Sequence, residues 1–92
     1  MPLQFAWDSR KALANLRKHG VSFGEAASAF EDPFSVTIPD PLHSESEERF
    51  VLIGVSRNQH LVVVAHVERG DIIRIISARI ASRAERRTYE EG

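Results

Sequence analysis

Residues 61–78 have the sequence LVVVAHVERGDIIRIISA, in which two apolar runs flank a short polar segment. Valine and isoleucine dominate both runs, and β-branched side chains favour strands. The segment Glu68-Arg69-Gly70-Asp71 offers a glycine for the positive backbone φ of a compact turn. The stretch therefore predicts two antiparallel strands, over residues 61–67 and 72–78, joined by that turn.

The strand over residues 61–67 is apolar on both of its faces. One face carries Leu61, Val63, Ala65 and Val67, and the other carries Val62 and Val64. A strand of this kind needs cover on both faces, and helices from the N-terminal part of the chain can cover one of them. For the other face two alternatives are open: either a C-terminal helix is sufficient, or a partner protein or second subunit completes the burial.

Two helices are predicted near the start of the chain, after a short strand over residues 3–7. The first helix begins after the N-cap Asp8 and ends at His19, because Gly20 suits a left-handed C-cap. Its buried stripe is predicted to be Ala12, Leu13 and Leu16, with Lys11, Asn15 and Lys18 on the polar side. The second helix opens with a capping box between Ser22 and Glu25 and stops before Asp32-Pro33.

The remaining predicted elements complete a single domain over residues 1–92. Strands over residues 34–38 and 49–56 are separated by a polar loop over residues 39–48. A capping box between Ser82 and Glu85 starts a short C-terminal helix that ends near residue 91. The order predicts an α+β fold: a mainly antiparallel sheet with two N-terminal helices packed on one face and a short C-terminal helix.

The composition excludes several classes of site. The chain has 92 residues, of which 42% are hydrophobic and 27% charged, and it has no cysteine for disulfides, thiolate zinc sites or nucleophiles. The four histidines lack the spacing of a helical zinc site, and no glycine-rich phosphate loop is present, so we expect neither a metal nor another cofactor. No apolar run approaches the ~20 residues that cross a bilayer, and no secretory signal is visible, so we expect a cytoplasmic protein without a membrane partner.

Charge is unevenly distributed along a chain whose formal net charge is only -1. Residues 1–48 hold four basic and eight acidic side chains, whereas residues 49–92 hold eight basic and five acidic ones. All eight of those basic residues are arginine, which binds phosphate through a planar fork. Six of them surround the last hairpin and helix: Arg69, Arg74, Arg79, Arg83, Arg86 and Arg87. The cluster indicates a phosphate-binding surface, whereas each arginine taken alone is typical of a surface ion pair.

The predicted strand and helix arrange these arginines in two ways. Strand alternation places Ser77 and Arg79 on the face of Ile73 and Ile75, with Arg74 on the opposite face. At the last helix, a basic stripe is formed at roughly helical spacing by Arg79, Arg83 and Arg86.

RNA cleavage without a metal needs groups of this kind, because RNA carries its own nucleophile, the 2′-hydroxyl. The protein must align that hydroxyl, transfer protons and stabilise the charge that develops on the phosphorus. Arginine can supply the charge stabilisation. The candidates for proton transfer are His66, Glu68, Glu85 and Tyr89, of which Glu85 is also expected to cap the last helix.

Several motifs of this chain resemble the BrnT family of type II toxins. They include Phe5-x-Trp7-Asp8, Lys11-x-x-x-Asn15-x-x-Lys18-His19-Gly20-Val21, Phe30-x-Asp32-Pro33, Glu68-Arg69-Gly70, Arg74-Ile75-Ile76-Ser77-Ala78-Arg79 and Glu85-Arg86-x-x-Tyr89-Glu90. The resemblance covers nearly the whole chain in the family's order. It implies a RelE-like fold and a metal-independent endoribonuclease that inhibits translation by cleaving RNA.

The same resemblance implies a partner and a set of site residues. The partner would be a BrnA-like ribbon-helix-helix antitoxin, which neutralises the toxin in a heterotetramer and alone contacts operator DNA. The candidate catalytic residues are His66, Glu68, Arg79, Glu85 and Tyr89, and the candidate substrate-binding residues are Arg69, Arg74, Arg83 and Arg86. All of them except His66 and Arg83 match the family's motifs, and those two are candidates from the pattern of residues alone. Two other functions are weighed: a catalytically weak or inactive protein of the same fold that acts as a co-repressor, and a small DNA-binding module, which no helix-turn-helix pattern supports.

Overall fold

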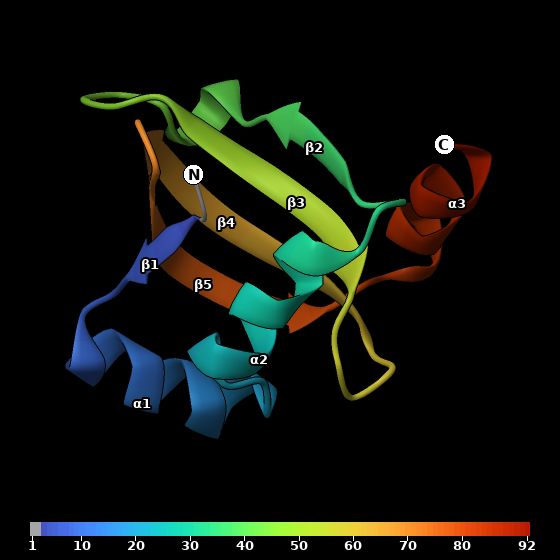
Figure 1. Cartoon of the computed structure of the whole chain (residues 1–92), viewed down its shortest axis with the longest axis horizontal. Helices are drawn as coiled ribbons and strands as arrows, with labels where there is room; N and C mark the ends of the chain where they lie inside the picture. Colours follow the sequence, from blue (N-terminus) through green and yellow to red (C-terminus); the bar gives the residue numbers. More distant parts are fainter. Residues whose placement is uncertain (1–2) are drawn as a thin grey trace.

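The structure, a computed structural model, describes residues 3–92 (Figure 1). Its strands are β1 (Gln4–Ala6), β2 (Val36–Pro39), β3 (Arg49–Val55), β4 (Leu61–Arg69) and β5 (Ile72–Ile80). Its α-helices are α1 (Ser9–His19), α2 (Phe23–Ser28) and α3 (Arg83–Glu91), and its 3-10 helices are η1 (Ala29–Glu31) and η2 (Pro41–His43). The predicted α+β class is confirmed. None of the helices within residues 3–92 is long and apolar enough to cross a membrane.

The five strands form one sheet in the order β1-β5-β4-β3-β2. Strands β2 to β5 pair in antiparallel fashion, whereas β1 is parallel to β5. Strand β1 pairs only with the start of β5, from Ile72 to Arg74, so no strand within residues 3–92 lies beside the second half of β5 on that edge. Helices α1 and α2 pack on one face of the sheet, and α3 lies at its far end (Figure 1).

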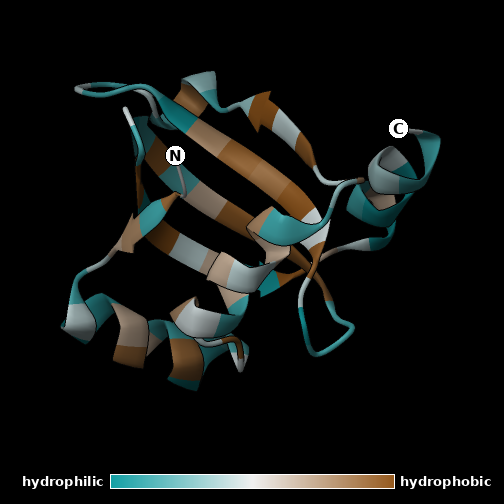
Figure 2. Cartoon of the chain, in the orientation of Figure 1, coloured by the Kyte–Doolittle hydropathy of each residue, from teal (hydrophilic) through white to brown (hydrophobic). Residues whose placement is uncertain are grey.

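The hydrophobic core has two parts, one on each face of the sheet. The central strands β3 and β4, which lie between them, carry mostly hydrophobic residues (Figure 2). The larger part lies between the sheet and the helices α1 and α2, and includes Phe23, Leu52, Val62, Val64 and Ile75. On the other face, Ala81 and Tyr89 pack against a smaller cluster of Ile53, Leu61 and Val63. The four residues from Leu61 to Val64 are at most 5% exposed. At these four residues the C-terminal segment and the helices α1 and α2 together cover β4, and the alternative of a partner that completes the cover of this face stays a prediction.

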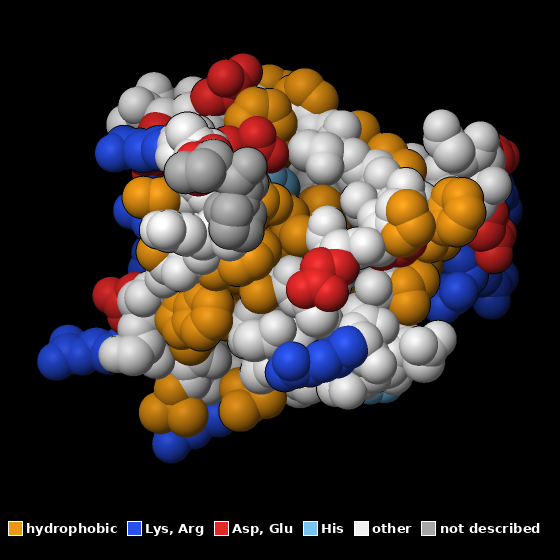
Figure 3. All heavy atoms as spheres, viewed as in Figure 1, with side chains coloured by type: hydrophobic (Ala, Val, Ile, Leu, Met, Phe, Trp, Pro, Cys, Tyr) orange, Lys and Arg blue, Asp and Glu red, His pale blue; other side chains and the backbone are white. Residues whose placement is uncertain are grey.

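Helix α1 does not bury the residues that its spacing predicts. Leu13 and Leu16 are 50% and 44% exposed, whereas Asn15 is only 7% exposed. Figure 3 accordingly shows hydrophobic side chains at the surface over α1. The predicted buried stripe is wrong for the two leucines, and the predicted polar position of Asn15 lies inside.

Asn15 is buried because its amide bonds the backbone of β5. Its Nδ2 donates to the carbonyl oxygens of Val21 at 3.0 Å and Ala78 at 2.8 Å, and its Oδ1 accepts from the Ala78 N–H at 3.1 Å. The Asn15 side chain thus hydrogen-bonds both the backbone N–H and the backbone C=O of Ala78, on an edge of β5 where no strand within residues 3–92 pairs with them. Helical periodicity carries no information about such a long-range bond.

A β-bulge interrupts the pairing of β4 with β5. The register passes from Ala65 opposite Ser77 to His66 opposite Ile75, so Ile76 has no residue opposite it. A bulge of this kind moves the following side chains of its strand to the other face of the sheet.

The bulge reverses the predicted facing of the residues at the end of β5. Ala78 joins Ile75 in the core on the helix side, so its neighbours Ser77 and Arg79 project from the opposite face. We call this opposite face, which α1 and α2 do not cover, the open face. The predicted grouping of Ser77 and Arg79 with Ile75 is wrong, and Arg79 instead shares the open face with Arg74.

We expect Asn15→Ala to lower the free energy of unfolding by about 2–3 kcal/mol, because it leaves buried backbone groups without partners. The control is Leu16→Ala on the same helix, which removes a half-exposed side chain and should cost less than about 1 kcal/mol. Urea denaturation at neutral pH measures both. Equal stabilities for the two variants would contradict the role assigned to Asn15.

Candidate functional site

A pocket of about 210 Å³ lies on the open face, where the sheet meets the segment around η2. Four apolar residues of the sheet line it: Val51, Val63, Ala65 and Ile76. Its polar and charged lining residues are Asp40, His43, Arg49, Ser77 and Arg79. Two guanidinium groups, an imidazole, a carboxylate and a hydroxyl therefore meet over an apolar surface. Within residues 3–92, no group of three or more His, Asp or Glu side chains is placed to hold a metal ion.

Arg79 is held in this pocket by a bidentate bond to Glu85. Its Nη1 and Nη2 donate to the two carboxylate oxygens at 2.6 and 2.7 Å. The same carboxylate accepts from the Ser82 N–H at 2.8 Å, while the Ser82 hydroxyl accepts from the Glu85 N–H, which completes the predicted capping box. The bond from Arg79 outweighs partial burial and, with Ser82, lowers the pKa of Glu85 to about 2. Glu85 is therefore ionised at neutral pH and fixes the guanidinium of Arg79 in one orientation.

The histidine in this pocket was missed by sequence reasoning. Nδ1 of His43 donates to Oδ2 of Asp40 at 2.9 Å, which leaves Nε2 available to a ligand. The Asp40 N–H donates to the Arg49 carbonyl at 2.9 Å, and the Ser44 hydroxyl bridges the same two residues by donating to Asp40 and accepting from the Arg49 N–H. The only local signal is the spacing Asp40-Pro41-x-His43, in which the aspartate can bond the histidine across one 3-10 turn.

Two predicted substrate-binding arginines, Arg69 and Arg74, lie elsewhere on the open face. Both form ion pairs with Glu47, at 2.8 Å in the case of Arg69. They line a second, largely apolar hollow with Val67 and Ile72, which shares no lining residue with the first pocket. Glu47 belongs to the predicted polar loop over residues 39–48, and its ion pairs join this loop to the end of the sheet.

Two of the predicted catalytic residues, His66 and Glu68, form a pair on the helix side of the sheet. His66 is fully buried, with its ring edge-on to Phe30 at 4.9 Å and stacked against Phe50 at 6.1 Å. Its Nε2 lies 2.9 Å from Oε2 of Glu68. The sheet therefore separates this pair from Arg79, and the catalytic roles of His66 and Glu68 stay predictions.

Tyr89, Arg83 and Arg86 lie on α3 outside the pocket. The Tyr89 hydroxyl donates to Oδ2 of Asp32 at 2.6 Å, and the same oxygen accepts from the Val55 N–H at 2.9 Å. The bond to the Asp32 carboxylate, together with burial and charge repulsion, raises the pKa of Tyr89 to about 12. Tyr89 thus ties α3 to the end of β3. Arg83 and Arg86 are exposed and line neither hollow described above, so the roles predicted for these three residues also stay predictions.

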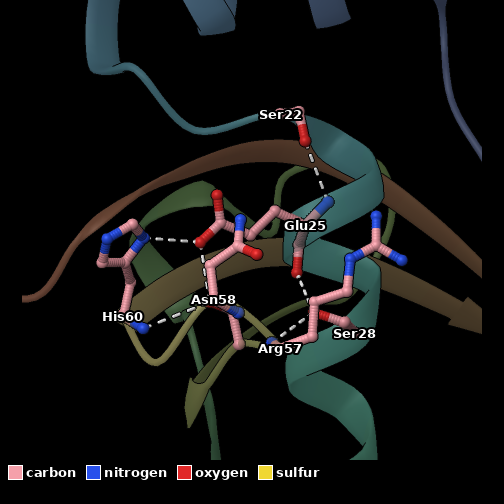
Figure 4. Close-up of polar contacts among 7 residues, drawn as sticks. Ser22, Glu25, Ser28, Arg57, Asn58 and His60 are labelled. Carbon is pink, nitrogen blue, oxygen red and sulfur yellow. Dashed lines mark hydrogen bonds and ion pairs between the residues drawn. The ribbon is translucent and has the colours of Figure 1, made fainter.

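A second cluster missed by sequence reasoning joins α2 to the turn between β3 and β4 (Figure 4). The Ser22 hydroxyl accepts from the Glu25 N–H, as predicted, but the Glu25 side chain does not return to cap Ser22. Its carboxylate instead accepts from the Ser56 hydroxyl at 2.6 Å and from Nδ1 of His60 at 2.7 Å. Burial opposes ionisation of Glu25, but these bonds and the charge of His60 outweigh it and lower its pKa. The predicted capping box is therefore right for the bond to the Ser22 hydroxyl and wrong for the return bond from the Glu25 side chain.

Comparison with known proteins shows what this chain is similar to. The model of a family described as "Ribonuclease toxin, BrnT, of type II toxin-antitoxin system" matches residues 7–85. Among solved structures, the crystal structure of the Brucella abortus ribonuclease toxin, BrnT, matches with a TM-score of 0.68 and 23% sequence identity, over 88% of this chain and 99% of that chain. This likeness shows a shared fold. A search of curated proteins gives no match.

The Tyr89–Asp32 bond predicts a titration that can be followed directly. Tyr89 is the only tyrosine, so the ultraviolet absorbance of its phenolate should rise with a midpoint near pH 12, and Asp32→Asn should return the midpoint toward the ordinary value of 10.0. Because folding raises this pKa, the fold should lose stability as the pH rises from about 10 to about 12. A midpoint near 10 in the folded native chain would contradict the bond, and Asp40→Asn serves as the control.

Proposed function

Because this chain belongs to the BrnT family of ribonuclease toxins of type II toxin–antitoxin systems, we propose that it cleaves RNA with the groups of the open-face pocket. The observation that supports this assignment is the meeting of Arg49, Arg79 and the Asp40–His43 pair in one pocket. Charge stabilisation and proton transfer are the two functions that metal-independent cleavage requires. Cleavage of messages would inhibit translation, and we place this reaction in the cytoplasm.

The reaction is an in-line attack by the RNA on itself. Nε2 of His43 takes the proton of the 2′-hydroxyl, the 2′-oxygen bonds to phosphorus, and the bond to the 5′-oxygen breaks. Solvent water protonates the departing oxygen, so the products are a 2′,3′-cyclic phosphate and a 5′-hydroxyl. The guanidinium groups of Arg49 and Arg79 stabilise the negative charge on the phosphoryl oxygens during the attack.

Asp40 and Glu85 are positioning residues in this proposal. Asp40 accepts from Nδ1 of His43 and so keeps Nε2 as the acceptor of the proton. Glu85 orients Arg79 through its two hydrogen bonds. Proton transfer is assigned to His43 in preference to the predicted His66, because the sheet lies between His66 and Arg79.

The family also implies an antitoxin partner. We propose that this partner is a BrnA-like ribbon-helix-helix protein that forms a heterotetramer with the toxin and alone contacts operator DNA. Support comes from the exposed apolar side chains of Trp7, Leu13 and Leu16, which the chain itself leaves uncovered at α1 and just before it. A protein partner can bury such a surface.

Arg79→Ala should abolish toxicity and leave the fold intact. Expressed in a bacterium without the antitoxin, the native chain should arrest growth with loss of cellular RNA, whereas Arg79→Ala should do neither. Loss of one group that stabilises transition-state charge lowers kcat by about 10²–10³-fold. Arg57→Ala, in the exposed turn between β3 and β4, is the control. A folded Arg79→Ala chain with full toxicity would contradict the assignment. A folded native chain that causes neither growth arrest nor RNA loss would favour the co-repressor alternative.

His43→Gln should lower kcat by about 10²–10⁴-fold, since it removes the group that accepts the proton. Steady-state cleavage of a short RNA at neutral pH measures this effect, with His60→Gln in the Glu25 cluster as control. The assignment would be contradicted if His43→Gln kept native activity while a folded His66→Gln chain lost it. That result would assign proton transfer to His66.

A further inference from the structure

Helix α1 presents its charged side to the edge of the sheet. Lys11, Asn15 and Lys18 follow at i, i+4 and i+7, so they share one side of the helix. Asn15 bonds Ala78, which places this side against the uncovered edge of β5. Leu13 and Leu16 of α1 stay about half exposed, so burial of these apolar side chains does not explain this orientation.

A hollow of about 240 Å³ lies between this side of α1 and β5. Lys11, Lys18 and His19 line it from the helix, and Ile76 and Ser77 line it from the strand. No carboxylate lines the hollow, and the ion pairs among residues 3–92 include neither lysine. This differs from the open face, where Glu47 and Glu85 hold arginines. The hollow of α1 therefore offers positive charge that pairs with no carboxylate among residues 3–92.

The hollow adjoins the open-face pocket at the β-bulge. Ile76 and Ser77 line both of them, so one strand edge forms a common wall. On one side of this wall lie Arg49 and Arg79, and on the other lie Lys11 and Lys18. Cationic side chains therefore lie on both sides of this edge of β5.

We propose that the α1 hollow is a phosphate-binding subsite for the same RNA strand that is cleaved in the open-face pocket. The strand crosses the edge of β5 at Ser77, and the ammonium groups of Lys11 and Lys18 bind phosphates next to the cleaved one. Lysine binds phosphate as a point charge, and no Phe, Tyr or Trp lines the hollow to stack on a base. The subsite consequently supplies affinity that does not depend on sequence. This inference rests on the proposed function, because it extends the same substrate.

The test compares two double variants of the full-length chain. Lys11→Gln with Lys18→Gln removes the cations of the hollow, and Arg10→Gln with Arg17→Gln removes two charges at the same spacing on other sides of α1. The probe is a short fluorescent RNA with 2′-O-methyl groups, which lacks the nucleophile and is not cleaved. Fluorescence anisotropy gives its Kd between about 0.05 and 0.3 M salt, the range over which phosphate contacts depend strongly on salt.

The lysine variant should bind this RNA roughly 10- to 25-fold more weakly at 0.1 M salt, with a salt slope reduced by about 1.4, as two lost phosphate contacts require. The arginine variant should bind like the native chain. With cleavable RNA, the lysine variant should show a raised KM and a kcat within about twofold of native, because its lost contacts lie outside the reacting groups.

Three results would overturn the subsite. Both double variants could weaken binding equally, which would indicate bulk charge alone. The native chain and the lysine variant could bind RNA with the same Kd. The lysine variant could lose affinity for the antitoxin and keep its affinity for RNA, which would assign the hollow to the protein partner. If the proposed function is wrong, the result differs: the native chain binds the probe through the lysines but does not cleave ordinary RNA.

Discussion

The hydrogen bonds between the Asn15 amide and the backbone of Ala78 fix the part of the sheet on which the site depends. Ala78 follows the bulge, and its side chain enters the core on the helix side. Arg79 must then project from the open face, because neighbouring residues of a strand alternate. The same bonds hold the side of α1 that carries Lys11 and Lys18 against the edge of β5. The bulge thus sets the facing of the arginine, and the buried amide holds the adjoining edge of β5 and the cationic hollow in place.

The net charge of the chain says little about its site, because carboxylates and cations are paired there in fixed positions. Glu85 orients Arg79, Asp40 orients His43, and Glu47 holds the arginines at the other end of the open face. Each carboxylate lowers the net charge of the chain and restricts the motion of the side chain that it binds. The helix side differs, since His66 is enclosed there by aromatic rings. The open face therefore presents its charged side chains at a surface pocket, whereas the helix side encloses its histidine.

The elements with local signals were predictable. The hairpin of β4 and β5 follows from two apolar runs and a glycine turn, and α3 follows from the capping box of Ser82 and Glu85, whose bonds stay within one helical turn. The errors arise where a distant partner competes with a local one. Glu25 leaves its capping box for Ser56 and His60. The bulge depends on pairing between strands, so alternation along β5 alone placed Arg79 on the wrong face. His43 lies in a segment without periodicity, and only the fold brings it to the arginines.

The claim that RNA is bound and cleaved on the open face is tested most directly by mapping where an uncleavable RNA binds. Backbone amide chemical shifts of the isotope-labelled chain would be recorded by NMR during titration with a 2′-O-methyl RNA. The account predicts that the largest shifts occur at Ser77, Arg79 and the segment around His43, with residues of α2 unaffected. Shifts concentrated around His66 and Phe30, with the open face unchanged, would contradict it.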